Sequence, residues 1–261
     1  MRNVRLIARL DVKAPNLVKG VQLEGLRKLG DPNDRALRYY QQGIDEIYYE
    51  DIVASLYERN SLLDIVEKTT RNIFVPVIVG GGLRTTNDVA AVLRAGADKV
   101  AINTAAIKNP KIVKEVARRF GSQCMVLSIQ AKRQGSSWEA YYDNGREHSG
   151  LDVIEWACKG QSLGAGEIII TSVDREGTAS GFDNELLKKV TAAIDIPIIA
   201  SGGMGKLEDL SEAVRTTSVD AIAMAHVLHY DVFSIPEIRQ YCLNENIPVR
   251  SVDLVPGYFT T

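Results

Sequence analysis

The stretch PVIVGGGLRTTNDVAAVL, residues 76–93, recurs in similar form as PIIASGGMGKLEDLSEAV, residues 197–214. Each copy is a short apolar run, then glycines, then apolar residues at helical spacing. This order predicts a buried strand, a tight turn and an amphipathic helix. A second pair, GIDEIYYEDI at 43–52 and GAGEIIITSV at 164–173, repeats at a similar distance. The distance is close to half the chain, which indicates an internal duplication.

Short β-branched runs alternate with amphipathic stretches along the whole chain. Eight such units in 261 residues predict a single domain of class α/β, a closed (β/α)8 TIM barrel. We expect two half-barrel repeats, at about 1–121 and 122–248, and an open doubly wound sheet is the alternative. The expected strands are 4–10, 46–50, 75–79, 99–102, 124–129, 167–171, 196–200 and 221–224. The expected helices are 33–42, 61–71, 87–95, 110–120, 151–163, 184–194, 207–216 and 235–243.

Composition excludes several classes of function. A net charge of -2 provides no basic field for nucleic acid or for a membrane surface, and no apolar run has the length of a bilayer span. The three cysteines, Cys124, Cys158 and Cys242, are scattered without metal-ligand spacing. We therefore expect a cytoplasmic protein with no metal site.

Four predicted strand ends carry glycines or small polar residues: VGGGLR (79–84), INTAAI (102–107), DREGTASGFD (174–183) and ASGGMGK (200–206). Glycine lets a backbone approach a ligand closely and turn its N–H groups toward it. Loops after the seventh and eighth strands of this fold, here ASGGMGK and MAHVLH (224–229), usually hold a phosphate. By the internal repeat, VGGGLR and INTAAI, after the third and fourth strands, form a second cradle on the opposite side. The pattern predicts a substrate with two phosphates; the alternative is that the glycines only make tight turns.

The chain also resembles a known family. LDVK (10–13), VGGG (79–82), GADKVAINTAA (96–106), GAGEIIITSVDREGT (164–178) and IPIIASGGMGK (196–206) are similar to the cyclase subunit of imidazole glycerol phosphate synthase. The resemblance implies a barrel that forms a heterodimer with a glutaminase subunit docked at its bottom. Ammonia from that subunit reacts at the top with a bis-phosphorylated ribulosyl aminoimidazole-carboxamide nucleotide. The products are imidazole glycerol phosphate, for histidine biosynthesis, and aminoimidazole-carboxamide ribotide. No cofactor is implied.

The resemblance also implies which residues bind the substrate. A lid after the first strand carries a lysine that matches Lys19, but Ala14-Pro15-Asn16 departs from the family's lid sequence. His226 stands where the family usually has a serine. The expected phosphate-binding residues are Gly82, Asn103 and Thr104 on one side and Gly177, Gly203, Ala225 and His226 on the other.

Four charged residues open otherwise apolar strands: Arg5, Glu46, Lys99 and Glu167. Such charges are costly unless they are paired, and their signs allow a closed ring of ion pairs. The resemblance implies that this ring gates the entry of ammonia. The alternative is a ring that only plugs the barrel floor.

At the centre of the predicted site the chain departs from the family. The resemblance implies two catalytic aspartates, at the ends of the first and fifth strands. Asp11 matches the first, and Gln130 stands in the place of the second. An amide cannot exchange a proton near neutral pH, so Gln130 is expected only to orient the substrate.

A second departure lies just below Asp11. Arg9 and Glu50 replace a small residue and an apolar residue of the family, and both have the parity of inward-facing side chains. If the register at the floor continues upward, Arg9 meets Glu50. We expect a buried ion pair near the ammonia channel, with Tyr48 between the two charged layers. An arginine partner would keep Glu50 ionised, so Glu50 is not expected to replace the missing acid.

These departures leave three functional hypotheses. The leading one is the cyclase, with Asp11 as the general acid and base. One rival is a paralogue that feeds ammonia to a sugar amidotransferase in surface-polysaccharide biosynthesis. The other is an ammonia conduit without chemistry of its own. A related isomerase of the same pathway has no glutaminase partner, so the complete floor ring disfavours it.

Overall fold

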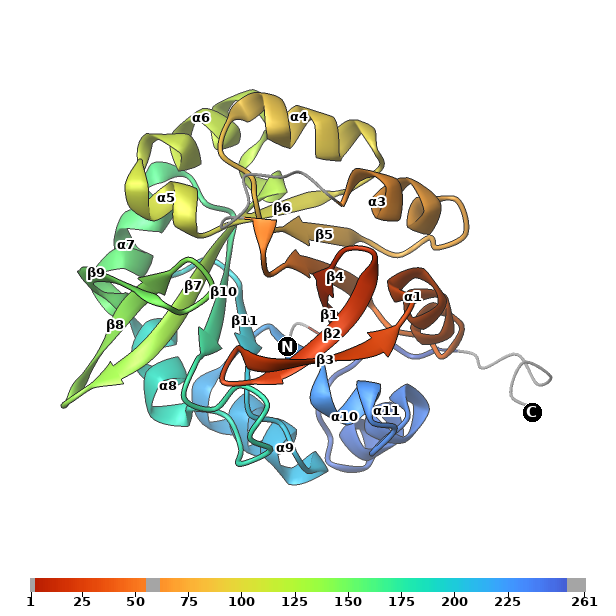
Figure 1. Cartoon of the computed structure of the whole chain (residues 1–261). Coiled ribbons are helices and arrows are strands. Elements are labelled where there is room, and N and C mark those ends of the chain that lie inside the picture. Colours follow the sequence, from red (N-terminus) through yellow and green to blue (C-terminus); the bar gives the residue numbers. More distant parts are fainter. Residues whose placement is uncertain (1–2, 55–61, 253–261) are drawn as a thin grey trace.

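Eight parallel strands close into a barrel that is surrounded by helices (Figure 1). The computed structural model describes residues 3–54 and 62–252. In barrel order the strands are β1 (Arg5–Lys13), β4 (Glu46–Asp51), β5 (Val77–Gly80), β6 (Lys99–Ile102), β7 (Met125–Gln134), β10 (Glu167–Ser172), β11 (Ile198–Ser201) and β12 (Ala221–Met224). β12 pairs with β1, and β7 pairs with β10, which closes the ring. The predicted (β/α)8 barrel is confirmed, and the open sheet is wrong.

Helices fill the crossovers and the end of the chain. Their positions follow local signals: Thr85 and Asp88 form a capping box before one helix, and Ser234 and Glu237 do so before another. The helices are α1 (Pro32–Gln41), α3 (Leu63–Thr70), α4 (Thr86–Arg94), α5 (Thr104–Lys108), α6 (Lys111–Phe120), α7 (Val153–Leu163), α8 (Asn184–Ala193), α9 (Leu207–Thr217), α10 (His226–His229) and α11 (Ile235–Asn244), with a 3-10 turn at Ser122–Cys124. The expected helix 61–71 began at Ser61, which lies outside the described residues. Within the described ranges, no helix has the length and apolar character needed to cross a bilayer.

Two β-hairpins that the sequence did not predict extend the barrel at its mouth. The first is β2 (Asn16–Val21) with β3 (Glu24–Gly30), and it continues β1. The second is β8 (Ser137–Tyr142) with β9 (Glu147–Asp152), and it continues β7. Each hairpin follows the first strand of one expected half-barrel. The division into halves at about 1–121 and 122–248 stays a prediction.

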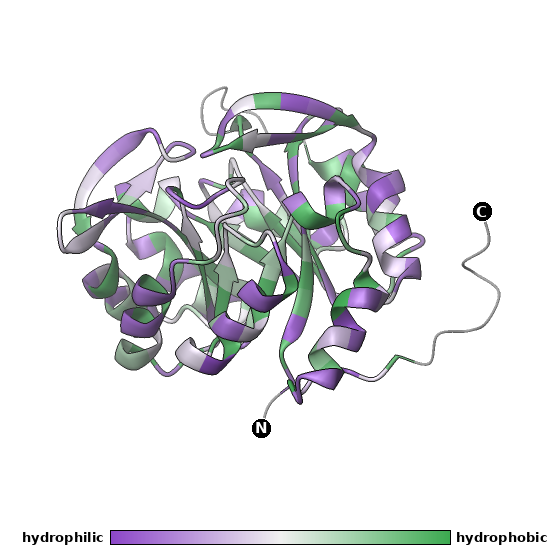
Figure 2. Cartoon of the chain, turned by 90° about the horizontal axis from the view of Figure 1, so that it is seen from below, coloured by the Kyte–Doolittle hydropathy of each residue, from purple (hydrophilic) through white to green (hydrophobic). Residues whose placement is uncertain are grey.

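The apolar core has two parts. The larger part lies between the strands and the helices, and Figure 2 shows the hydrophobic strands inside and a mixed helical surface outside. The smaller part is a layer inside the barrel, to which eight strands contribute small or branched side chains and Tyr48. This layer consists of Ile7, Tyr48, Ile78, Ala101, Val126, Ile169, Ile199, Ala221 and Ala223. It separates a charged floor from a charged mouth.

The pairing of β1 with β4 sets the height of the charged residues in the barrel. Ile7 is the backbone partner of Glu46, and Asp11 is the backbone partner of Glu50. Because alternate residues of a strand face the same side, Arg5, Ile7, Arg9 and Asp11 form a column inside the barrel. This column runs from the floor through the apolar layer to the mouth.

Candidate active site at the barrel mouth

Asp11 is buried near the end of β1, between two cations. Its carboxylate accepts a hydrogen bond from Arg9 Nε at 2.9 Å and lies 3.5 Å from Lys19 Nζ. Burial alone would raise the pKa of Asp11, but the charges of Arg9 and Lys19 outweigh it, and the pKa lies below its usual range. Asp11 is therefore a carboxylate at neutral pH, a state that can accept a proton.

The guanidinium of Arg9 forms a polar layer just below the mouth. Its Nη1 donates to Thr171 Oγ1 at 2.9 Å and to Ser201 Oγ at 3.0 Å. The guanidinium carbon also lies 5.6 Å from the centre of the Tyr48 ring. Arg9 thus connects β1 with β4, β10 and β11, and these contacts compensate for the burial of its charge.

The predicted ion pair between Arg9 and Glu50 is wrong. Both side chains are buried, as expected. The prediction used a register in which the two residues meet, whereas the observed register pairs Arg9 with Tyr48 and Glu50 with Asp11. Arg9 therefore forms its ion pair with Asp11, on its own strand. Within residues 3–54 and 62–252, no cation lies within ion-pair distance of the Glu50 carboxyl.

Glu50 is consequently a buried carboxyl in an unusual state. The hydroxyl of Tyr48 donates a hydrogen bond to Glu50 Oε2. Burial raises the pKa of Glu50 to about 8; the charge of Arg9 opposes this shift, and Asp11 and Asp51 add to it. At neutral pH the protonated form of Glu50 predominates.

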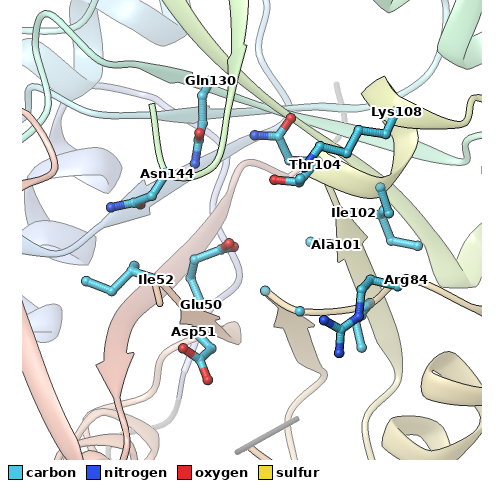
Figure 3. Close-up of a pocket in the computed structure, with 15 residues that line it drawn as sticks. Glu50, Asp51, Ile52, Arg84, Ala101, Ile102, Thr104, Lys108, Gln130 and Asn144 are labelled. Carbon is cyan, nitrogen blue, oxygen red and sulfur yellow. The ribbon is translucent and has the colours of Figure 1, made fainter. Parts of the chain in front are cut away.

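Gln130 lies on β7 and faces the same space as Glu50. Gln130 is 4% exposed, and its Oε1 has no hydrogen-bond partner among the described residues. A buried amide oxygen without a partner is costly and is usually satisfied by a water molecule or a ligand. In Figure 3 the Gln130 amide and the Glu50 carboxyl point into one cavity from different strands.

This first cavity has a volume of about 220 Å³ and lies over β4 to β7. The expected phosphate residues Gly82, Asn103 and Thr104 line it. Two cations that the sequence analysis did not single out, Arg84 and Lys108, also line it (Figure 3). Glycine backbone, a hydroxyl and two cations are groups that bind phosphate.

A second cavity lies over the opposite half of the barrel and is much smaller, about 10 Å³. All four residues expected for the second cradle line it: Gly177, Gly203, Ala225 and His226. Burial, together with the charge of Lys19, lowers the pKa of His226, so its imidazole is neutral at pH 7. In this conformation the cavity has room for about one water molecule.

The hairpin β2–β3 reduces the space over this second cavity. Lys19 is only 3% exposed and forms an ion pair with Glu176, in the loop after β10. The backbone N–H of Gln22 donates to the carbonyl of Glu176 at 2.7 Å. A Cβ at Gly177 would lie 2.5 Å from the carbonyl oxygen of Gly20, so the two loops are in close contact. Lys19 is thus brought to the site, where it contacts two carboxylates.

The four charged residues expected at the floor form a closed ring of ion pairs. Arg5 lies 2.6 Å from Glu46, and Lys99 lies 2.7 Å from Glu46 and 2.9 Å from Glu167. The fourth contact joins Arg5 and Glu167. The carboxylates raise the pKa of both cations, although burial alone would lower it. The ring lies at the opposite end of the barrel from the mouth.

Several contributors to the mouth were not identified as site residues from the sequence. Thr171 and Ser201 have the same parity as the inward-facing Ile169 and Ile199, so strand alternation could have identified them. Glu176 lies within the quoted motif 174–183, but its partner Lys19 comes from a hairpin that was not predicted. Among residues 3–54 and 62–252, no three His, Cys, Asp or Glu side chains are grouped as a metal site.

A family model and the curated relatives of this chain point to the same protein family. A family model described as histidine biosynthesis protein matches residues 5–234. The imidazole glycerol phosphate synthase subunit HisF of Legionella pneumophila is 61% identical over 212 residues, which are 81% of this chain and 100% of that protein. The subunit HisF of Dehalococcoides mccartyi strain BAV1 is 45% identical over 250 residues, 96% of this chain and 99% of that protein.

Proposed function

We infer that the barrel mouth carries out a cyclase reaction, because this chain belongs to the family of HisF, the cyclase subunit of imidazole glycerol phosphate synthase in histidine biosynthesis. The main support from the site is the pair of glycine-lined cavities over opposite halves of the mouth. We propose that a bis-phosphorylated ribulosyl aminoimidazole-carboxamide nucleotide spans the mouth with one phosphate in each cavity. Ammonia then converts it to imidazole glycerol phosphate and aminoimidazole-carboxamide ribotide.

Each cavity has a distinct role in this proposal. Gly82, Asn103 and Thr104 bind one phosphate, and Arg84 and Lys108 add positive charge beside it. The second phosphate binds at Gly177, Gly203, Ala225 and His226, where glycine backbone lines the cavity and the neutral imidazole can donate a hydrogen bond. This assignment uses every phosphate residue that the family resemblance implied.

The second cavity must enlarge before a phosphate can bind there. At about 10 Å³ it is too small for a phosphate group. We propose that the hairpin β2–β3 moves away, which breaks the contacts of Lys19 with Asp11 and Glu176. Lys19 is then free to pair with the incoming phosphate.

Asp11 and Gln130 act on the reacting part of the substrate between the two phosphates. Asp11 is ionised because Arg9 and Lys19 lower its pKa, so its role is that of a base. Gln130 orients the substrate through its amide, whose oxygen lacks a partner among the described residues. No proton is assigned to Gln130.

The floor of the barrel faces the proposed source of ammonia. We propose that a glutaminase subunit docks there, and that the ring of Arg5, Glu46, Lys99 and Glu167 gates the entry of ammonia. The apolar layer above the ring suits neutral ammonia better than the ammonium ion, because an unpaired charge is costly in such a layer. Three free cysteines fit the reducing cytoplasm that we propose as the location.

The two rival hypotheses have less support. Neither relative reported above is named for sugar modification or for ammonia transport alone. Gln130 remains the feature that motivates both rivals, because it removes one of the two expected carboxylates.

An ammonia-dependent assay tests the proposal. The purified chain is incubated with the ribulosyl nucleotide and ammonium salts, and formation of both products is followed. Turnover by the wild-type chain is the expected result. Turnover only after Gln130→Asp would favour a repurposed barrel, and no turnover in either protein would favour a conduit.

A further inference from the structure

Glu50 differs from the other carboxylates of the mouth in the groups that it contacts. Asp11 pairs with Arg9 and Lys19, and Glu176 pairs with Lys19. The Glu50 carboxyl instead accepts a hydrogen bond from a phenol, that of Tyr48. Of Asp11, Glu50 and Glu176, Glu50 is therefore the one without an ion pair among the described residues.

The barrel provides space for this carboxyl beside the substrate cavity. A Cβ at Gly80, on the neighbouring strand β5, would lie 2.4 Å from Glu50 Oε2 and 2.9 Å from the Tyr48 hydroxyl. Any residue other than glycine at position 80 would therefore displace the carboxyl. Glu50 itself lines the first cavity together with Gln130, and Figure 3 shows its carboxyl directed into that space.

Glu50 and Asp11 are neighbours with opposite protonation states. They are backbone partners on β1 and β4, and both side chains face the barrel interior. Burial raises the pKa of Glu50 to about 8, whereas Arg9 and Lys19 hold the pKa of Asp11 below its usual range. Two carboxyls whose surroundings separate their pKa values in this way suit an acid and a base.

We propose that Glu50 is the proton donor of the cyclase reaction and supplies the acid function that Gln130 cannot. The proposal rests on the proposed function, in which ammonia reacts with a ketose. It makes Glu50 a catalytic residue on β4, whereas the second acid was expected on β7. Gln130 then orients the group to which Glu50 donates its proton.

The proton transfers balance in the condensation of ammonia with a carbonyl group. Ammonia forms a C–N bond to the carbonyl carbon, and the oxygen becomes the hydroxyl of a carbinolamine. Glu50 gives its proton to this hydroxyl, the C–O bond breaks and water leaves. Asp11 takes a proton from the nitrogen, which yields the neutral imine. Proton exchange with solvent then restores both carboxyl groups.

Replacing Glu50 with glutamine tests this role, because glutamine keeps the size and polarity of the side chain but cannot donate a proton as an acid. In the ammonia-dependent assay at pH 7, Glu50→Gln is expected to lower kcat by a factor of about 10²–10⁴ with little change in KM. The matched control is Glu115→Gln, on the exposed face of α6, which is expected to keep wild-type kcat. Circular dichroism checks that both variants are folded.

A double variant distinguishes proton donation from a structural role. In the Glu50→Gln background, Gln130→Asp returns a carboxyl to the other side of the cavity and is expected to recover kcat by about tenfold or more. A purely structural defect at β4 would not respond to a change on β7. Absence of any recovery would therefore contradict the proposal.

The pH dependence of the wild-type chain gives a test that needs no variant. With free ammonia held constant, kcat is expected to fall as the pH rises through about 8, because the acid must be protonated. The titratable and charged groups around Glu50 are Arg9, Asp11, Tyr48, Asp51, Arg84 and Lys108. Wild-type kcat in Glu50→Gln would overturn the role of Glu50 alone. A wild-type chain without turnover would contradict the proposed function as well.

Discussion

The barrel carries buried charge at two levels, and the two levels are balanced differently. At the floor, two cations and two carboxylates alternate in a closed ring. Arg5 and Lys99 each contact both Glu46 and Glu167. Every member therefore has two partners of opposite charge, and the ring compensates for the burial of its charges through these contacts.

At the mouth, the buried charges of the described residues do not form a closed ring. Arg9 pairs with Asp11, and Lys19 pairs with Asp11 and Glu176, which leaves Glu50 with a hydrogen bond from Tyr48. Burial raises the pKa of both Glu46 and Glu50, but only Glu50 lacks a cation in contact, and its pKa is raised to about 8. A buried carboxyl without a cationic partner among the described residues, rather than buried charge as such, therefore distinguishes the mouth, which suits proton transfer, from the floor, which suits closure.

The largest expected effect comes from removing the base at the mouth. Asp11→Asn keeps the shape of the side chain but removes the proton acceptor and the partner of two cations. We expect kcat in the ammonia-dependent assay to fall by a factor of about 10²–10⁴. Asp64→Asn, on the exposed face of α3, is the matched control. Asp11→Asn with more than half of wild-type kcat would show that the mouth does not use this carboxylate.

Breaking the floor ring is expected to change stability and ammonia supply, but not the chemistry. Glu46→Ala removes a partner from both Arg5 and Lys99. We expect the free energy of unfolding to fall by about 2–4 kcal/mol. This loss is smaller than that for a fully buried ion pair, because the side chains of Arg5 and Lys99 are 29% and 20% exposed and water screens their charges. Chemical denaturation measures this change, with Glu115→Ala as the surface control.

Kinetics with two ammonia sources complete the test of the floor. With the glutaminase partner present, glutamine-dependent turnover of Glu46→Ala should fall, while turnover with ammonium salts stays near the wild-type rate. An equal loss with both sources would contradict the separation of floor and mouth.

The buried Glu50 carboxyl predicts a pH dependence of stability. The folded-state pKa of Glu50 is about 8 against an ordinary value of 4.5, so the folded protein binds the proton more tightly. The stabilisation that this proton provides is complete below about pH 4.5 and is lost as the pH rises through about 8. Between these values the free energy of unfolding falls by no more than about 1.4 kcal/mol per pH unit. Glu50→Gln should remove this slope between pH 5 and 8. Denaturation at each pH measures it, and an unchanged slope would contradict the assignment.

The smallest expected effect concerns the hairpin over the mouth. Lys19→Met removes the ion pairs with Asp11 and Glu176, and we expect faster amide hydrogen exchange in β2 and β3. Lys28→Met, an exposed position on β3, is the control on the same hairpin. Exchange rates that do not differ between the two variants would show that Lys19 does not hold the hairpin.

Sequence alone predicted which side chains face the barrel interior, but not their level along the barrel axis relative to side chains of the neighbouring strand. Alternation along β1 set Arg9 and Asp11 inside the barrel, as found. Strands in a closed barrel are staggered by amounts that the local pattern does not specify. The two-residue error in the expected pairing of β1 with β4 therefore assigned Arg9 to Glu50 and concealed that Glu50 has no ion pair among the described residues.

The strands and phosphate residues were easier to predict than the hairpins. β6 and β12 were predicted with correct bounds because short apolar runs between helical patterns have few alternatives. The outer strands β3 and β9 are largely exposed. The inner strands β2 and β8 are more buried, but each is six residues long and mixes polar with apolar residues, so no apolar run marked the hairpins. The contact of Lys19 with Glu176 depends on the first hairpin and could not be predicted without it.

The most direct test of an acid at the barrel mouth is the protonation state of Glu50. Infrared difference spectra of the wild-type chain against Glu50→Gln, recorded from pH 5 to 10, report on this single carboxyl group. A protonated Glu50 gives the carbonyl band of a neutral carboxylic acid at pH 7, and this band disappears as the pH rises through about 8. A spectrum with only carboxylate bands at pH 7 would contradict the assignment of Glu50 as an acid.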